Sequence, residues 1–102
     1  MAKYFMSMMT QVPGGGETLS GAEKGKLYGE HGTYLKSLEA NGSLVFAGYT
    51  MGANPGEFST AVFASENLSA AEKVAYAAPM VAAGLLHAEV KEFGVFVARA
   101  VP

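Results

Sequence analysis

The spacing of apolar residues divides this chain into strand-like and helix-like segments. Four segments have the alternating or continuous apolar pattern of β-strands: 3–12, 43–50, 58–64 and 86–90. Two segments carry apolar residues three and four positions apart, as helices with one buried face do: 21–40 and 70–78. The order β-α-β-β-α-β predicts an α+β protein of ferredoxin-like topology, with a four-stranded antiparallel sheet and two helices on one face.

The first predicted helix has signals at both ends. Ser20 and Glu23 fit a capping box, in which each side chain accepts a hydrogen bond from the other residue's backbone N–H. Gly42 follows the helix and favours the left-handed backbone of a helix end. The stripe expected to face the sheet consists of Leu27, His31, Tyr34, Leu35 and Leu38.

Glycines weaken this helix. Gly25 and Gly29 share one of its faces, and each costs about 1 kcal/mol relative to alanine. Two explanations stay open. Another backbone could approach this face closely, or the helix could begin later than its cap indicates.

The second half of the chain has a similar set of signals. Ser69 and Glu72 fit a second capping box, and Pro79 is expected to stop the helix that they open. Residues 79–84 should form one further turn. After the last strand the alternation changes phase at Glu92 and Phe93, which indicates a β-bulge or a bend.

Apolar residues point to both faces of the predicted sheet. The first strand has Tyr4, Met6 and Met8 on one face and Phe5 and Met9 on the other. In the second strand, strict alternation puts Leu44 and Phe46 on the same face. Two helices cover only one face, so we expect a second copy of the chain to cover the other, in a two-fold homodimer. The alternative is an unusually apolar monomer.

The composition narrows the classes of function. The chain has 102 residues, half of them hydrophobic, and we expect one domain over residues 1–102. A net charge of −2 and a pI near 5.6 argue against binding to nucleic acid or to an anionic membrane. The lack of cysteine excludes a thiol nucleophile and a cysteine-ligated metal. The apolar run 74–86 is too short to span a bilayer and the first residues do not resemble a signal peptide, so we expect a cytoplasmic protein.

His31 is the leading candidate for chemistry. Histidine has an unperturbed pKa close to neutrality, and the helical spacing turns His31 toward the sheet. A general base in this position needs a partner that fixes its tautomer. The side chains that could serve are Glu57, Glu66, Glu89, Tyr49 and Ser65. The alternative is a core histidine bonded to a backbone carbonyl.

Three weaker features complete the candidates. His87 and Glu89 share a strand face but lack a third metal ligand, so we expect a solvated or interface pair and no metal site. The glycine run 14–16 lacks the spacing of a phosphate-binding loop, and we expect a flexible loop that could cover a cleft. The six methionines could line an adaptable apolar pocket or pack in the core or an interface: Met1, Met6, Met8, Met9, Met51 and Met80.

Several short stretches resemble the YCII-related (YciI-like) family of dimeric α+β barrels. They occur in the family's order along nearly the whole chain: Lys3-Tyr4-Phe5, His31 with Tyr34-Leu35, Gly42-Ser43-Leu44, Ser65-Glu66-Asn67-Leu68 and Pro79-Met80-Val81. The resemblance implies a site that pairs His31 with an aspartate directly before Pro79. This sequence has Ala78 in place of that aspartate.

The resemblance also implies a small-molecule enzyme that needs no cofactor. Characterised relatives include a lyase-type dehydrochlorinase that acts on a chlorinated hydroxyaromatic compound. By this likeness, His31 would move a proton during elimination or isomerisation of a small substrate, with Tyr49 or a glutamate assisting. The cleft would lie between the first helix, the sheet and residues 50–57. Because Ala78 removes the family carboxylate, two alternatives stay open: a non-catalytic module that binds a small ligand or a partner, and a purely structural homodimer.

Overall fold

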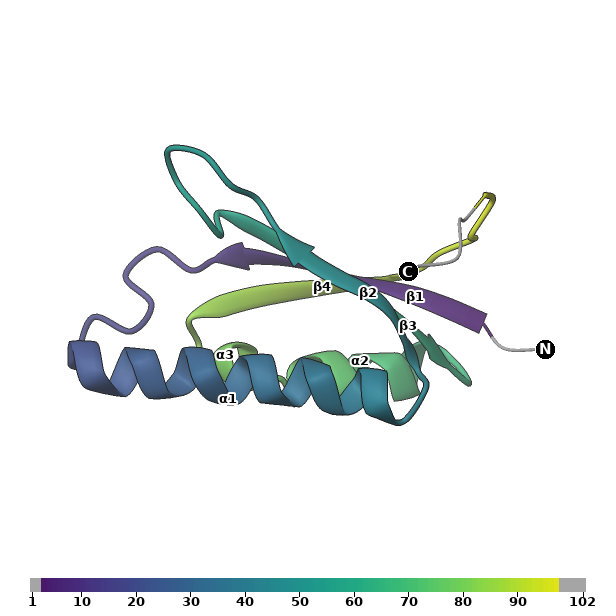
Figure 1. Cartoon of the computed structure of the whole chain (residues 1–102), viewed down its shortest axis with the longest axis horizontal. Coiled ribbons are helices and arrows are strands. Elements are labelled where there is room, and N and C mark those ends of the chain that lie inside the picture. Colours follow the sequence, from purple (N-terminus) through teal and green to yellow (C-terminus); the bar gives the residue numbers. More distant parts are fainter. Residues whose placement is uncertain (1–2, 98–102) are drawn as a thin grey trace.

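The computed structural model describes residues 3–97. The elements along them are β1 Lys3–Gln11, α1 Gly21–Ala40, β2 Leu44–Tyr49, β3 Phe58–Ser65, α2 Leu68–Tyr76, α3 Pro79–Ala82 and β4 Leu86–Glu92. The strands form one antiparallel sheet in the order β2-β3-β1-β4. Figure 1 shows the helices together on one face of this sheet. The α+β, ferredoxin-like fold is confirmed, and α3 is the further turn expected over residues 79–84.

The ends of α1 are as the sequence predicts. The Ser20 hydroxyl accepts a hydrogen bond from the N–H of Glu23 at 3.1 Å, and the Glu23 carboxylate accepts one from the N–H of Ser20 at 3.0 Å. Gly42, with φ of 83°, follows the helix in the left-handed region. The capping box therefore fixes the start of α1 at Gly21.

The start of α2 corrects the prediction. The cap is Asn67, whose side-chain oxygen accepts from the N–H of Ala70 at 2.8 Å, and not Ser69. Asn67 lies two residues after the end of β3 and has the extended backbone that an N-cap requires, so the helix starts earlier. Pro79 then occupies the first turn of α3, where its missing N–H has no partner to lose.

Neither of the two explanations left open by the sequence accounts for the glycines of α1. The helix does not begin late, because Gly21 already belongs to it. A Cβ built on Gly25 or Gly29 would meet no atom within 4 Å, so no backbone approaches closely. Within the described chain, these glycines lower the helix propensity with no packing reason.

A β-bulge in β2 overturns the expected alternation there. Leu44 pairs with Phe63 and faces the helices, whereas Phe46 pairs with Val62 and faces the other way. The register shifts between Leu44 and Phe46, since the bulge adds one residue at that point. The phase change at the end of β4 has a different cause, because that strand ends at Glu92, and the next N–H, of Phe93, makes a further bond to the carbonyl of Tyr4 at 2.8 Å.

The core lies between the sheet and α2. Its buried members come from β1, β3, β4 and α2: Phe5, Met9, Ala61, Phe63, Ala71, Ala75, Leu86, Ala88 and Val90. The buried residues of α2 are the alanines Ala71 and Ala75, which let the helix lie close to the sheet, and Val74 packs against the core from its partly buried side. No helix within residues 3–97 is long and apolar enough to cross a bilayer.

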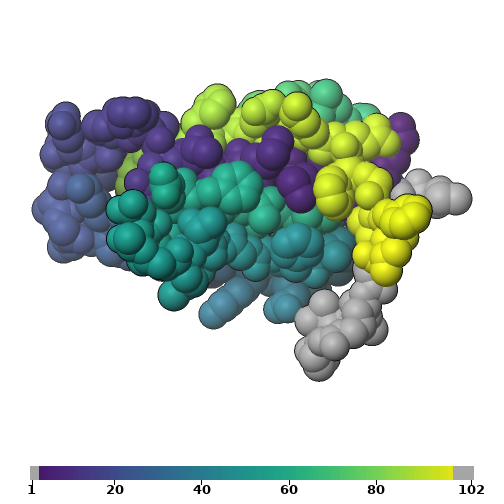
Figure 2. All heavy atoms as spheres, turned by 90° about the horizontal axis from the view of Figure 1, so that it is seen from above, coloured from purple at the N-terminus to yellow at the C-terminus, as the bar shows by residue number. Residues whose placement is uncertain are grey.

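The opposite face of the sheet carries no helix. Figure 2 looks onto this face, where side chains of the strands form the surface. The pairing register places six large or branched side chains here: Tyr4, Met6, Met8, Phe46, Phe58 and Val62. Phe46 is 47% exposed and Phe58 is 37% exposed. Within the described chain, this face therefore has an apolar patch over β1, β2 and β3 that is partly open to solvent, with the charged residues Glu89 and Lys91 beside it on β4.

Candidate functional site

A cavity of about 750 Å³ lies between α1, α3 and the sheet. Its lining includes the ends of β1 and β2, the start of β3 and the turn at Pro55 and Gly56. This is the place where the sequence predicts a cleft. Cavities of this size commonly hold small organic molecules.

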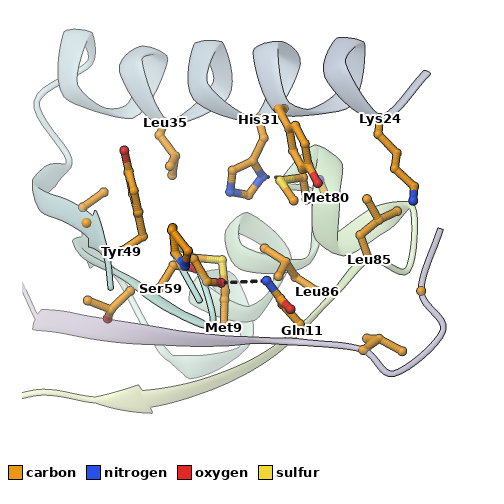
Figure 3. Close-up of a pocket in the computed structure, with 18 residues that line it drawn as sticks. Met9, Gln11, Lys24, His31, Leu35, Tyr49, Ser59, Met80, Leu85 and Leu86 are labelled. Atoms are coloured by element: carbon orange, nitrogen blue, oxygen red, sulfur yellow. Dashed lines mark hydrogen bonds between the residues drawn. The ribbon is translucent and has the colours of Figure 1, made fainter. Parts of the chain in front are cut away.

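One stripe of α1 forms the roof of the cavity. Lys24, Tyr28, His31 and Leu35 are spaced by four, three and four residues, so they share one face of the helix. Figure 3 shows His31, Lys24 and Leu35 pointing from α1 toward the strands. The sequence predicts His31 and Leu35 in this stripe but misses Lys24 and Tyr28. The same spacing, continued toward the start of the helix, identifies both residues.

His31 is buried and opens onto the cavity. Its residue surface is 8% exposed, and its Nδ1 atom accepts a hydrogen bond from the backbone N–H of Met80 at 3.3 Å (Figure 3). Burial lowers the pKa of His31, because removal from water disfavours the charged imidazolium. The neutral form of the ring therefore dominates near neutral pH.

The bond to Met80 also fixes the tautomer. A ring nitrogen that accepts an N–H cannot carry a proton, so in neutral His31 the proton lies on Nε2. Within residues 3–97 no group accepts a hydrogen bond from Nε2. The side chain thus offers the cavity a hydrogen-bond donor and not a lone pair.

Ala78 explains why Met80 turns to His31. Ala78 is the N-cap of α3 and gives no side-chain hydrogen bond, and Met80 is the second residue of that helix. A capping side chain commonly accepts the N–H of this second or third residue. Here the N–H of Met80 in α3 is accepted by His31, which belongs to α1. The partner of His31 is thus a backbone N–H, and neither the carboxylate nor the backbone carbonyl considered from the sequence.

The sequence pattern of one protein family matches nearly all of the chain. The YCII-related domain matches residues 4–94. The chain belongs to the YCII-related family. The resemblance found in its short sequence stretches is confirmed.

The YCII-related chain is also similar in fold to a solved structure. It is the 5-chloro-2-hydroxyhydroquinone dehydrochlorinase of Burkholderia phenoliruptrix, in complex with 2,5-dihydroxybenzoquinone. The two share a TM-score of 0.69 and 20% sequence identity, over 89% of this chain and 93% of that chain. At this identity the likeness concerns the fold alone. No curated protein matches the chain in sequence.

Only one of the expected assisting residues of this YCII-related protein reaches the cavity. Tyr49, at the end of β2, lines it and is 66% exposed. Ser65 ends β3 and Glu66 follows it, at the opposite end of that strand from Ser59 and Thr60 of the lining. Glu57 and Glu89 also lie outside the lining. Within residues 3–97, no acidic side chain lines the cavity.

The lining combines apolar walls with a few polar side chains. The apolar side chains are Met9, Val12, Leu35, Met80, Leu85 and Leu86. Gln11 donates from its side-chain amide to the carbonyl of Gly56 at 3.3 Å, which ties β1 to the turn before β3 (Figure 3). Of the six methionines, Met9 and Met80 line the pocket.

The glycine run closes one end of the cavity. Gly15 lies in the lining, and its N–H donates to the carbonyl of Val12 at 2.8 Å. A Cβ on Gly15 would lie 2.8 Å from the carbonyl oxygen of Gly84 and 2.9 Å from that of Val12. The flexible loop expected here is thus packed against the residues just before β4, and only glycine fits at its closest point.

His87 and Glu89 lie on the open face of the sheet, away from the cavity. Both belong to β4, and Glu89 is 3.4 Å from the ammonium of Lys91. Among the residues that the structure describes, no group of three metal-ligating side chains occurs.

Proposed function

We propose that this YCII-related protein is a small-molecule enzyme whose active site is the cavity at His31. The observation that carries the proposal is that the two nitrogens of the imidazole ring have different surroundings. Nδ1 is engaged by Met80, and Nε2 opens onto a space large enough for a substrate. A core histidine without function would have no need of such a cavity.

The chemistry proposed is an elimination or isomerisation without a cofactor. In such reactions a carbon loses a proton and negative charge develops on a neighbouring oxygen of the substrate. The Nε2–H of His31 would donate a hydrogen bond to that oxygen and stabilise the charge. His31 therefore acts as a donor here, in place of the general base expected from the sequence. Tyr49 is the assisting residue that reaches the cavity. Its hydroxyl would hold the water that takes the carbon's proton, and in an elimination the leaving group departs to solvent with its bonding electrons.

A small hydroxylated ring is the proposed substrate. Met9, Leu35 and Met80 give the cavity apolar and adaptable walls, which suit a planar ring. The structurally similar dehydrochlorinase was solved with a dihydroxybenzoquinone, which supports this choice.

A non-catalytic binding module is the second candidate. It is favoured by the absence of any acidic side chain from the lining, among the described residues, because a carboxylate is the usual base for removing a proton from carbon. In this alternative the same cavity would hold the ligand unchanged.

Turnover separates the two candidates. Chlorinated and unchlorinated hydroxyhydroquinones would be offered to the protein, with chloride release and ultraviolet absorbance as readouts. We expect turnover by the wild type and a loss of about 100-fold in kcat/KM in His31→Gln. Glu30→Gln, a change on the exposed side of α1, is the matched control and should keep full activity. Binding without turnover in the wild type would favour the binding module.

We further propose that the protein is a homodimer. The open sheet face, with Phe46 and Phe58 exposed, is the surface that a second copy would cover. A cytoplasmic location stays a prediction.

A further inference from the structure

We propose that the cavity selects an anionic ligand, a small ring compound with a carboxylate at one end and a phenolic or carbonyl oxygen at the other. The carboxylate would lie at Lys24 and the oxygen at Nε2 of His31. This inference names the ligand class of the proposed active site and rests on the assignment of the cavity as that site.

Lys24 is the first observation. It is half-buried and lines the cavity, and it is the one basic side chain there apart from the neutral His31. The single ion pair among residues 3–97 joins Lys91 to Glu89, so Lys24 has no carboxylate within 4 Å in the described chain. An ammonium group beside apolar walls and without a counter-ion favours a ligand of negative charge.

The buried imidazole is the second observation, independent of charge. Nε2 of His31 carries a proton and has no acceptor within the described residues, although the residue is only 8% exposed. Nε2 opens onto the cavity, so a ligand oxygen bound there would accept its hydrogen bond in place of water. Phenolic and carbonyl oxygens both accept such a bond.

The spacing of the two groups sets the size of the ligand. Lys24 and His31 are seven residues apart on α1, so their Cα atoms are separated by about 10 Å along the helix axis. Leu85 and Met80 lie along the wall between them (Figure 3). The flexible lysine stem shortens the gap, so one ring with a short acidic arm spans it.

A matched pair of probes tests the charge. The acid is para-hydroxyphenylpropanoate, and the control is its amide, which has nearly the same shape and no charge. Isothermal titration calorimetry would measure both in the wild type and in Lys24→Met. Lys26→Met serves as the control variant, because Lys26 lies outside this cavity on the exposed side of the same helix.

We expect the wild type to bind the acid about tenfold more tightly than the amide, and added salt to reduce the difference. Lys24→Met should remove the preference by weakening the acid alone, and Lys26→Met should keep it. Equal affinities in the wild type, no binding of the acid, or a preference that survives in Lys24→Met would overturn the inference. The outcome is independent of turnover, since an inactive protein that prefers the acid would refute the enzyme and keep the anion site.

Discussion

The backbone N–H of Met80 donates a hydrogen bond to Nδ1 of His31 across 3.3 Å. The bond joins α3 to α1 at the wall of the cavity. Because Ala78 supplies no cap, His31 satisfies an amide that an N-cap side chain would otherwise satisfy. The same bond determines which ring nitrogen faces the ligand, so the helix end and the chemistry of the site are coupled.

Restoring an acid at the cap should reverse this arrangement. In Ala78→Asp, the new carboxylate would accept the Met80 N–H and lie beside the imidazole. The nearby negative charge favours imidazolium, so we expect the pKa of His31 to rise relative to the wild type. Titration of the imidazole proton signals by NMR measures this directly.

Two further variants separate charge from capping. Ala78→Ser can accept the same N–H without adding charge, and it should raise the pKa of His31 less than Ala78→Asp. Ala77→Asp places the acid one residue earlier, at an exposed position, and should change the pKa least. Equal values in the wild type and Ala78→Asp would show that the cap does not control His31.

The stability of the fold should depend on pH through His31. Burial lowers its pKa below the ordinary value of 6.5, so between these two values the unfolded chain binds more protons than the folded chain. Stability therefore rises with pH in this window: the contribution is complete above about pH 6.5 and is lost as the pH falls through the lowered pKa.

Urea unfolding of the wild type and His31→Gln across this pH range tests the effect. Glutamine does not titrate, so the variant should lose less stability in acid than the wild type does. Parallel curves for the two proteins would contradict the contribution of His31.

Replacing glycine by alanine should change the free energy of unfolding in opposite directions in the glycine loop and in α1. Gly15→Ala forces a Cβ against the carbonyl oxygens of Gly84 and Val12, and should lower the free energy of unfolding by about 1–3 kcal/mol. Gly25→Ala, on the open side of α1, should raise it by about 1 kcal/mol. Chemical denaturation measures both. Equal and small effects would show that the loop is not packed as described.

The open sheet face predicts the mass in solution. Sedimentation should give about twice the 10.6 kDa of one chain, because a second copy covers the apolar surface. Phe46→Glu should shift the protein toward monomers. Tyr76→Glu changes an equally exposed aromatic residue on the helical side and should leave the dimer intact. A wild-type monomer at micromolar concentration would refute this proposal.

Most of the fold could be predicted from the sequence, because most local patterns are compatible with only one type of secondary structure. The alternation of Leu86, Ala88 and Val90 and the pairing of Ser20 with Glu23 each predict the observed element. The β2 bulge does not follow, because apolar residues flank Val45 on each side and either phase would look the same. The start of α2 was predicted wrongly, because Ser69 and Glu72 match a capping box whereas the cap is Asn67, two residues earlier.

The site was harder to predict than the fold. The helical spacing turned His31 toward the sheet, but Lys24 and Tyr28 are polar and were left out of the buried stripe. The partner of His31 is a backbone amide 49 residues away. Every residue has such an amide, so no side-chain pattern marks it, and its position depends on how α3 packs against α1.

The tautomer of His31 is the most direct test of this account. Nitrogen-15 chemical shifts of the imidazole ring, correlated with its carbon-bound protons near neutral pH, identify which nitrogen carries the proton. We predict a neutral ring with the proton on Nε2, and a further shift of Nε2 when a hydroxyaromatic acid binds. A proton on Nδ1, or on both nitrogens, would contradict the bond from Met80 and the donor role of His31.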